Sequence, residues 1–311
     1  MMIGDKRIRS VNWHITTKCN YKCRFCYVQK LDREILDMKE ACSVLSKLKA
    51  FRTDVIDIEK INFVGGEPFL HPLFYELLQA AHEMGFVVSI VTNGSMINEK
   101  NIHRIAKYVD WVGVSVDSVS NLKEARLGRG MGHHVSHAVE VADLVHEYGI
   151  KLKVNTTVTK PTCKENMEPL IQRLKPHRWK VFQMLHIEGQ NDGCVRELAV
   201  TDSEFQNFTK RHEHISLIGG EKPVFESNED MIGSYFILSP SGKVISNEGG
   251  SYGTFEFEEF LEKQTSVINI EKYVNRGGLY EWADLTTTGT KREINEKIRP
   301  EFPPEMLQAN M

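Results

Sequence analysis

The chain has 311 residues, of which 41% are apolar and 26% charged, and its formal net charge is −3 at pH 7. These values are ordinary for a globular protein with a large core, and they argue against a general nucleic-acid binder, because such proteins are strongly basic. No apolar run approaches the roughly 20 residues of a membrane span, and residues 1–7 contain no apolar signal segment. We therefore expect a cytoplasmic protein without nucleic-acid or membrane partners.

Apolar, β-branched runs alternate with amphipathic helical patterns through the first 190 residues. This alternation predicts a parallel sheet with right-handed crossovers. Six strand units predict an α/β fold, a partial (β/α)6 barrel with reacting groups at the carboxyl ends of its strands; a doubly wound open sheet is the alternative. The predicted strands are 10–16, 60–64, 87–92, 111–117, 151–158 and 179–187, and the predicted helices are 38–49, 73–83, 99–107, 134–148 and 165–174.

The last third of the chain has a different pattern, with many turn residues and short apolar runs. Thr201 and Glu204 have the spacing of a capping box, which predicts the start of a helix. The runs 235–238 and 243–245 predict a hairpin that belongs to a covering lid. Four segments are therefore expected: an N-terminal tail (1–9), a barrel core (10–190), a C-terminal extension that covers the open barrel (191–290) and a disordered tail (291–311).

Three cysteines, Cys19, Cys23 and Cys26, follow the first predicted strand with the spacing C-x3-C-x2-C. Four thiolates would complete a tetrahedral zinc site or bind every iron of a cubane cluster. Three leave one iron without a protein ligand, and a small molecule can bind and react there. The spacing therefore predicts a [4Fe–4S] cluster, with a partial zinc knuckle or three incidental thiols as the alternatives.

Glycines and polar residues follow the next predicted strands. Gly65 and Gly66 let the backbone approach a ligand closely, and the proline that follows is expected to hold the carboxylate of Glu67 at the rim. Asn93 and Ser115 close the third and fourth strands, where they can hydrogen-bond a ribose or a carboxylate. Structural turns and helix caps explain both residues almost as well.

A second set of candidate residues is cationic. Arg129 lies between two glycines, on a loop suited to binding a carboxylate, although a solvated loop arginine is equally consistent. Lys153 and Asn155 share one face of the fifth strand, and Arg178 and Lys180 share one face of the sixth. Since apolar helices should cover the outer faces, these cations should point into the barrel. A buried cation is costly unless an anion neutralises it. With no inward carboxylates evident opposite, the pattern predicts a polyanionic ligand such as a triphosphate; strand-end charges exposed to solvent are the alternative.

The cysteine spacing after a strand resembles that of the radical S-adenosylmethionine (SAM) enzymes, in which SAM chelates the fourth iron. The order of motifs between residues 10 and about 285 is similar to that of the viperin family within this group. The matching runs are 10–14, 19–23, 60–69, 128–130, 178–183, 187–189, 226–228, 234–238 and 276–278.

The resemblance implies that a 5′-deoxyadenosyl radical takes the C4′ hydrogen of a nucleoside triphosphate, whose 3′-hydroxyl then leaves as water. The product is the 3′-deoxy-3′,4′-didehydro nucleotide, a chain terminator for viral polymerases. An electron donor such as flavodoxin or ferredoxin is implied as a partner. By resemblance, Cys19, Cys23 and Cys26 hold the cluster, Gly65, Gly66, Glu67, Asn93, Ser115 and Arg129 bind SAM, Asn12, Lys153, Arg178 and Lys180 bind the triphosphate, and Asn155 and Tyr235 lie near the sugar. We expect Tyr235 to deliver a hydrogen atom or a proton late in the cycle.

The chain departs from the family pattern in two places. In animal viperins an asparagine ends the strand after the Ser-Tyr-x-Ile-Leu run, whereas Ser246 stands at the equivalent position here, with Asn247 next. A hydroxyl can donate or accept a hydrogen bond, and uracil and cytosine differ in that property, so we expect UTP to be used in preference to CTP or beside it. The family's C-terminal tryptophan and the animal membrane helix are not found, which fits a cytosolic, non-animal protein. A monomer is expected.

Two other functions remain open at the level of the sequence. A radical SAM enzyme that modifies a peptide is the nearest alternative, although such enzymes often carry further cysteine clusters. Cys42, Cys163 and Cys194 are isolated, which counts against that alternative. A non-catalytic, zinc-stabilised nucleotide-binding scaffold is the second alternative.

Overall fold

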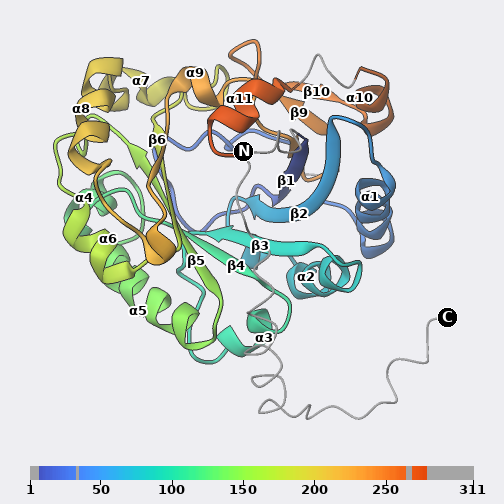
Figure 1. Cartoon of the computed structure of the whole chain (residues 1–311), viewed down its shortest axis with the longest axis horizontal. Coiled ribbons are helices and arrows are strands. Elements are labelled where there is room, and N and C mark those ends of the chain that lie inside the picture. The colour runs from blue at the N-terminus through green and yellow to red at the C-terminus, as the bar shows by residue number, and fades with distance from the viewer. Residues whose placement is uncertain (1–6, 33–34, 264–267, 279–311) are drawn as a thin grey trace.

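The computed structural model describes residues 7–32, 35–263 and 268–278 (Figure 1). Its strands form one sheet, and most neighbouring pairs are parallel. In chain order the strands are β1 (Ile8–Thr16), β2 (Ile56–Gly65), β3 (Val87–Thr92), β4 (Trp111–Ser115), β5 (Lys151–Val158), β6 (Arg178–Gln183), β7 (Val224–Glu226), β8 (Ile237–Leu238), β9 (Val244–Ser246) and β10 (Gly253–Phe255).

Helices connect consecutive strands of the first part of the chain. Thr201 and Glu204 form the capping box that the sequence predicts. Asp37 and Glu40 form another at the first helix, which was not predicted. The helices are α1 (Met38–Ala50), α2 (Phe74–Glu83), α3 (Ile102–Ala106), α4 (Asn121–Arg126), α5 (His134–Glu147), α6 (Glu168–Leu174), α7 (Val195–Leu198), α8 (Asp202–His212), α9 (Asn228–Met231), α10 (Phe257–Lys263) and α11 (Ile270–Asn275).

The order of the strands decides between the two predicted architectures. It runs β10-β9-β8-β1-β2-β3-β4-β5-β6-β7, so β1 to β6 lie side by side in chain order. A doubly wound sheet would reverse this order at a switch point, whereas here every crossover advances in one direction and leaves its helix on the same face. Figure 1 shows α1, α2, α3, α5 and α6 around the outside of the curved sheet. The partial barrel is therefore confirmed, and the doubly wound alternative is wrong.

The C-terminal part of the chain extends the sheet at both edges. Strand β7 pairs in parallel with β6, and β8 pairs in parallel with β1. The predicted hairpin is confirmed by the antiparallel pair β8 and β9. The division of the chain at residue 190 stays a prediction, and the predicted tail 291–311 lies outside the described residues. The expected N-terminal tail is too long by two residues, because β1 begins at Ile8.

Several other elements also differ from the prediction, such as the second strand, which begins at Ile56 and not at residue 60. The sixth strand was expected to reach residue 187 but ends at Gln183. The side-chain amide of Gln183 donates hydrogen bonds to the carbonyl of Val200 and to the carboxylate of Asp202. Helix α4 was not expected, because six residues are too few for a periodic pattern to be recognised. Ser120 caps it by accepting a hydrogen bond from the backbone of Lys123.

Strand β1 shows how alternation creates both a core and a site. Val11, Trp13 and Ile15 are at most 1% exposed and belong to the hydrophobic core, while Asn12 and His14 face the interior of the barrel and line a cavity. Among the described residues, no helix combines the length and apolarity needed to cross a membrane.

Candidate active site

One cavity of about 260 Å³ is lined by residues from β1 to β6, from the cysteine-bearing loop and from the C-terminal extension. It brings together most of the residues that the sequence singled out. Those that line it are Asn12, Cys19, Cys23, Cys26, Gly65, Gly66, Asn93, Ser115, Arg129, Lys153, Asn155, Arg178, Lys180 and Tyr235. Glu67 and Ser246 are not among its lining residues.

The cysteine loop, residues 17–27, is held between two glycine turns. The amide of Gly66 donates to the carbonyl of Thr16 (2.7 Å), and the amide of Lys22 donates to the carbonyl of Gly128 (3.0 Å). A Cβ on Gly66 would lie 2.2 Å from the Lys18 carbonyl oxygen, and one on Gly128 would lie 2.0 Å from the Lys22 carbonyl oxygen. Gly66 and Gly128 therefore leave room for the backbone of the cysteine loop. From the sequence, Gly66 was expected to allow the close approach of a ligand instead.

The three thiols of this loop are free and face the same cavity. Burial raises the pKa of Cys23 to about 12, and it raises the pKa of Cys19 and of Cys26 as well. Each thiolate also disfavours ionisation of its neighbours, so bound iron would be needed to hold all three deprotonated. Three free thiols on one wall of a cavity fit the [4Fe–4S] cluster, because a cubane takes each cysteine at a different iron.

The zinc alternative requires a different arrangement of ligands. A mononuclear zinc needs four ligands directed at one point. Within residues 7–32, 35–263 and 268–278, no three His, Cys, Asp or Glu side chains are arranged in this way.

Glu67 does not stand at the rim of the cavity, and that expectation is wrong. Its carboxylate is fully buried and accepts hydrogen bonds from the hydroxyl of Thr92 (2.8 Å) and from the backbone amide of Asn93 (2.9 Å). Burial raises the pKa of Glu67 to about 7, although these hydrogen bonds oppose the shift. The side chain therefore ties the end of β2 to the end of β3. The backbone of Gly65 and Gly66, which lines the cavity, is what remains available to a ligand.

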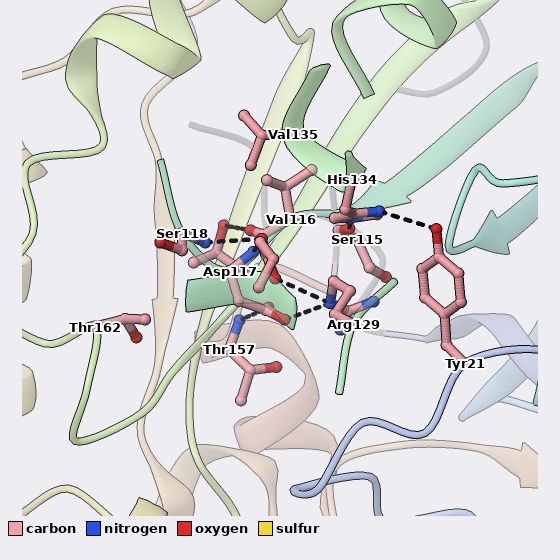
Figure 2. A network of polar contacts seen from close by, with 12 residues as sticks. Tyr21, Ser115, Val116, Asp117, Ser118, Arg129, His134, Val135, Thr157 and Thr162 are labelled. Carbon is pink, nitrogen blue, oxygen red and sulfur yellow. Dashed lines mark hydrogen bonds and ion pairs between the residues drawn. The ribbon is translucent and has the colours of Figure 1, made fainter. Parts of the chain in front are cut away.

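Arg129 is held by two buried carboxylates (Figure 2). Its Nε donates to Asp117 (2.5 Å) and lies 3.7 Å from Glu124. Asp117 also accepts a hydrogen bond from the amide of Thr157 (2.7 Å), so the pair is anchored to β5. Burial alone would lower the pKa of Arg129, but the two carboxylates raise it, so the guanidinium stays charged. The sequence left open whether Arg129 binds a carboxylate or is solvated, and the structure shows it paired with carboxylates of the protein and fixed in position at the cavity wall.

His134 links this network to the cysteine loop. Its Nε2 donates to the carbonyl of Ser115 (2.7 Å), and its Nδ1 lies 3.4 Å from the hydroxyl of Tyr21, which stands between the first two cysteines (Figure 2). Burial lowers the pKa of His134 to about 3, and the positive charge of Arg129 adds to that effect. The imidazole is therefore neutral in the folded protein at neutral pH.

A drop in pH from 7 to 5 should destabilise the protein partly through His134. The unfolded chain takes up the proton near the ordinary pKa of 6.5 while the folded chain does not, so stability falls as pH decreases below 6.5. Over 1.5 pH units the contribution is about 2 kcal/mol. Urea unfolding of the wild type and of His134→Gln at both pH values should show this difference. His103→Gln, away from the cavity, controls for the loss of a histidine. An equal pH dependence of the wild type and His134→Gln would contradict the prediction.

Lys180 has a carboxylate partner that the sequence did not anticipate. Glu226 on β7 is fully buried and forms an ion pair with the ammonium group of Lys180. Burial lowers the pKa of Lys180, and Glu226 opposes that shift. The expectation that no inward carboxylate lies opposite the cations is therefore wrong. Glu226 was missed because β7 has only three residues and was not recognised as a strand from the sequence.

The hydroxyl of Tyr235 joins this ion pair. It donates to Glu226 and lies 3.2 Å from the ammonium nitrogen of Lys180. The guanidinium of Arg276 lies 3.6 Å from the centre of the tyrosine ring. Burial and the charge of Glu226 raise the pKa of Tyr235 well above its ordinary value, so the phenol keeps its proton. Arg276 was not a candidate from the sequence, since nothing marked it beyond its place in a matching run.

The remaining cations belong to the same region. Arg178 donates to the carbonyl of Gly277, and Lys153 is 8% exposed. We call Lys153, Arg178, Lys180 and Arg276 the cation group. All four line the cavity, and Glu226 pairs with one of them, Lys180. Four cationic side chains that converge on one cavity suit an anionic ligand.

Asn155 and Asn247 add uncharged polar groups to the cavity wall. The Oδ1 of Asn155 is buried without a hydrogen-bond partner in the part of the chain that the structure describes. Asn247 accepts a hydrogen bond from the amide of Gly233 (2.8 Å) and lines the cavity. Ser246 instead points its hydroxyl toward the backbone amide of Glu248 (3.3 Å). The expectation that Ser246 faces a ligand is therefore wrong, and its neighbour in sequence occupies that place.

Sequence comparisons with known proteins identify the family to which the chain is similar. Residues 13–174 match the model of the radical SAM superfamily. An S-adenosylmethionine-dependent nucleotide dehydratase of Thermoplasmatales archaeon (strain ISO4-H5) is 37% identical over 281 residues, which cover 89% of this chain and 97% of that protein. A protein of Oncorhynchus mykiss with the same enzyme name is 35% identical over 292 residues, 88% of this chain and 80% of that one.

A solved structure supports the fold alone. Streptococcus suis SuiB bound to S-adenosylmethionine superposes with a TM-score of 0.58 over 77% of this chain and 60% of that one. Since the two sequences are only 16% identical, this likeness carries no information on substrate.

Proposed function

Because the chain belongs to the radical SAM superfamily and, within it, to the S-adenosylmethionine-dependent nucleotide dehydratases, we propose that it dehydrates a pyrimidine nucleoside triphosphate to the 3′-deoxy-3′,4′-didehydro nucleotide. The observation that carries this proposal is the cavity itself, which has three free thiols on one wall and the cation group on another. A triphosphate is the ligand whose charge matches several convergent cations.

The residues of the chain divide between the two ligands. Cys19, Cys23 and Cys26 would hold the cluster. The backbone of Gly65 and Gly66, together with Asn93, Ser115 and Arg129, would bind SAM, while Asn12 and the cation group would bind the triphosphate. When bound, the cluster and SAM would supply the radical chemistry that removes a hydrogen atom from the ribose of the nucleotide. The protein contributes orientation and a site closed to bulk water, where a radical is protected from side reactions.

The base is a pyrimidine in this proposal, and both UTP and CTP are candidates. A preference for UTP was expected from the hydroxyl of Ser246, which does not line the cavity. The amide of Asn247 can both donate and accept, so it suits the edge of either base. A low-potential electron carrier such as flavodoxin or ferredoxin would be the reductant of a cytoplasmic, monomeric enzyme.

Anaerobic incubation of the reduced holoprotein with SAM and each of the four common ribonucleoside triphosphates tests the function. The expected products are 5′-deoxyadenosine and a nucleotide lighter by one water, identified by mass spectrometry. If SAM is cleaved and all four nucleotides stay intact, the substrate is a different one and the proposal fails. A protein that binds zinc and no iron would support the scaffold alternative.

Tyr235 is the candidate for delivering a hydrogen atom or a proton late in the reaction. Its side chain is half-buried, and its hydroxyl is protonated and oriented by Glu226. Tyr235→Phe is expected to keep cleaving SAM but to lower didehydro nucleotide formation by about 100-fold, the size of a lost proton-transfer step. The ratio of product to 5′-deoxyadenosine measures this uncoupling. Tyr252→Phe, a second tyrosine of the cavity wall, is the matched control. Unchanged product formation by Tyr235→Phe would rule the role out.

A further inference from the structure

His14 is a buried residue of the cavity wall, and one of its ring nitrogens lacks a hydrogen-bond partner within the described residues. It lies on the inward face of β1 and is 4% exposed. Its Nδ1 is buried without a hydrogen-bond partner within the described residues. A buried imidazole nitrogen in this condition is costly unless a bound molecule supplies its partner.

The other buried histidines differ from His14 in this respect. Each of them is fixed by a hydrogen bond to the backbone, so each has a structural explanation. Their partners are the amide of Leu73 for His71, the carbonyl of Ser115 for His134 and the amide of Met167 for His212, at 3.1, 2.7 and 2.9 Å. His14 is thus the buried histidine of the described chain that is best explained by a ligand.

The position of His14 along β1 indicates which part of a ligand it would meet. It lies two residues after Asn12, about 7 Å along the strand, and the strand then leads into the cysteine loop. Its partner in the register with β2 is Val64, which also lines the cavity. His14 therefore stands between the residue proposed to bind the triphosphate and the thiols proposed to bind the cluster. The ribose of a nucleotide that spans these two ends occupies this interval.

We propose that His14 is a positioning residue that hydrogen-bonds a ribose hydroxyl of the bound nucleotide, an inference that rests on the proposed function. Burial lowers the pKa of His14 to about 4, so the ring is neutral at neutral pH and has one donor and one acceptor nitrogen. Such a ring can exchange a hydrogen bond with a hydroxyl without adding charge beside the reacting carbon.

The test measures how the protein discriminates among riboses. Equilibrium binding of UTP, 2′-deoxy-UTP and 3′-deoxy-UTP to the anaerobic holoprotein with SAM, without reductant, gives three affinities; the corresponding cytidine nucleotides are measured as well. The wild type is expected to bind one deoxy analogue about 10-fold more weakly than its ribonucleotide, the value of one buried hydrogen bond. His14→Leu is expected to bind that deoxy analogue and its ribonucleotide with equal affinity, because the imidazole that distinguishes them is gone.

Control variants separate hydrogen bonding from packing. His14→Phe keeps a ring without nitrogens and replaces the leucine variant if that does not fold; it too should lose the discrimination. His14→Asn places an amide near the position of Nδ1, so it should recover part of the discrimination between the ribonucleotide and the deoxy analogue. If His14 only filled space, His14→Phe would recover the discrimination instead. Full discrimination by the apolar variants, or none by the wild type, would overturn the inference alone. A wild type that binds no nucleotide would overturn the proposed function and the inference together.

Discussion

Replacing Cys23 by alanine is expected to remove the iron–sulfur cluster and, with it, all SAM cleavage above background. Two thiolates leave two irons of a cubane without protein ligands, which is too few to hold the cluster while SAM binds. The anaerobically reconstituted variant should lose the brown colour and the broad absorption near ~400 nm that Fe–S proteins show. Iron content and 5′-deoxyadenosine formation are the two measurements.

Other cysteines of the chain provide matched controls for this loss. Cys42 lies on α1 and Cys163 belongs to the main hydrophobic core, and neither lines the cavity. Cys42→Ala and Cys163→Ala should therefore retain iron and cleave SAM. If Cys23→Ala kept a full complement of iron, or if Cys163→Ala lost it, the assignment of the ligands would be wrong.

Replacing Lys180 by methionine should weaken nucleotide binding by about 100-fold or more. The change removes a cation from the cavity, and it leaves Glu226 buried without its ion-pair partner. A carboxylate in that position repels a triphosphate, and breaking a buried ion pair costs about 3–5 kcal/mol. The affinity of the holoprotein for UTP and CTP measures the effect, and the affinity for SAM should stay unchanged, because Lys180 is not among the residues assigned to SAM.

The double variant Lys180→Met/Glu226→Gln separates the two contributions. It also removes the carboxylate, so it should recover part of the affinity that Lys180→Met loses, as a double-mutant cycle on an interacting pair would show. Lys47→Met is the control, since Lys47 on α1 is also ion-paired to a glutamate, Glu258, and does not line the cavity. That variant should leave nucleotide affinity intact. Equal affinity of Lys180→Met and the wild type would remove Lys180 from the triphosphate site.

The sequence predicted the barrel because its strands and helices repeat with strong periodicity. The same periodicity placed Lys153 and Lys180 on inward faces, and the cavity includes both. Short elements were less predictable, since the three residues of β7 form a strand only by pairing with β6. For this reason Glu226 was missed as the partner of Lys180.

Contacts between distant segments account for the other errors. The carboxylate of Glu67 turns inward because Thr92 and Asn93, on another strand, offer it hydrogen bonds, and no local pattern in the sequence contains that information. The unpartnered Nδ1 of His14 is a similar case. Only the assembled barrel shows that no protein group reaches it within the described residues.

The placement of β7 and β8 on opposite sides of the six strands β1 to β6 has a consequence for synthesis of the protein. A nascent chain that has emerged from the ribosome as far as Gln183 already carries all three cysteines of the loop. It still lacks Glu226, Tyr235 and Arg276, which come from later segments. The cluster ligands are therefore made before the substrate pocket is complete, and competence for radical chemistry on a nucleotide should arise only after Arg276 has been made.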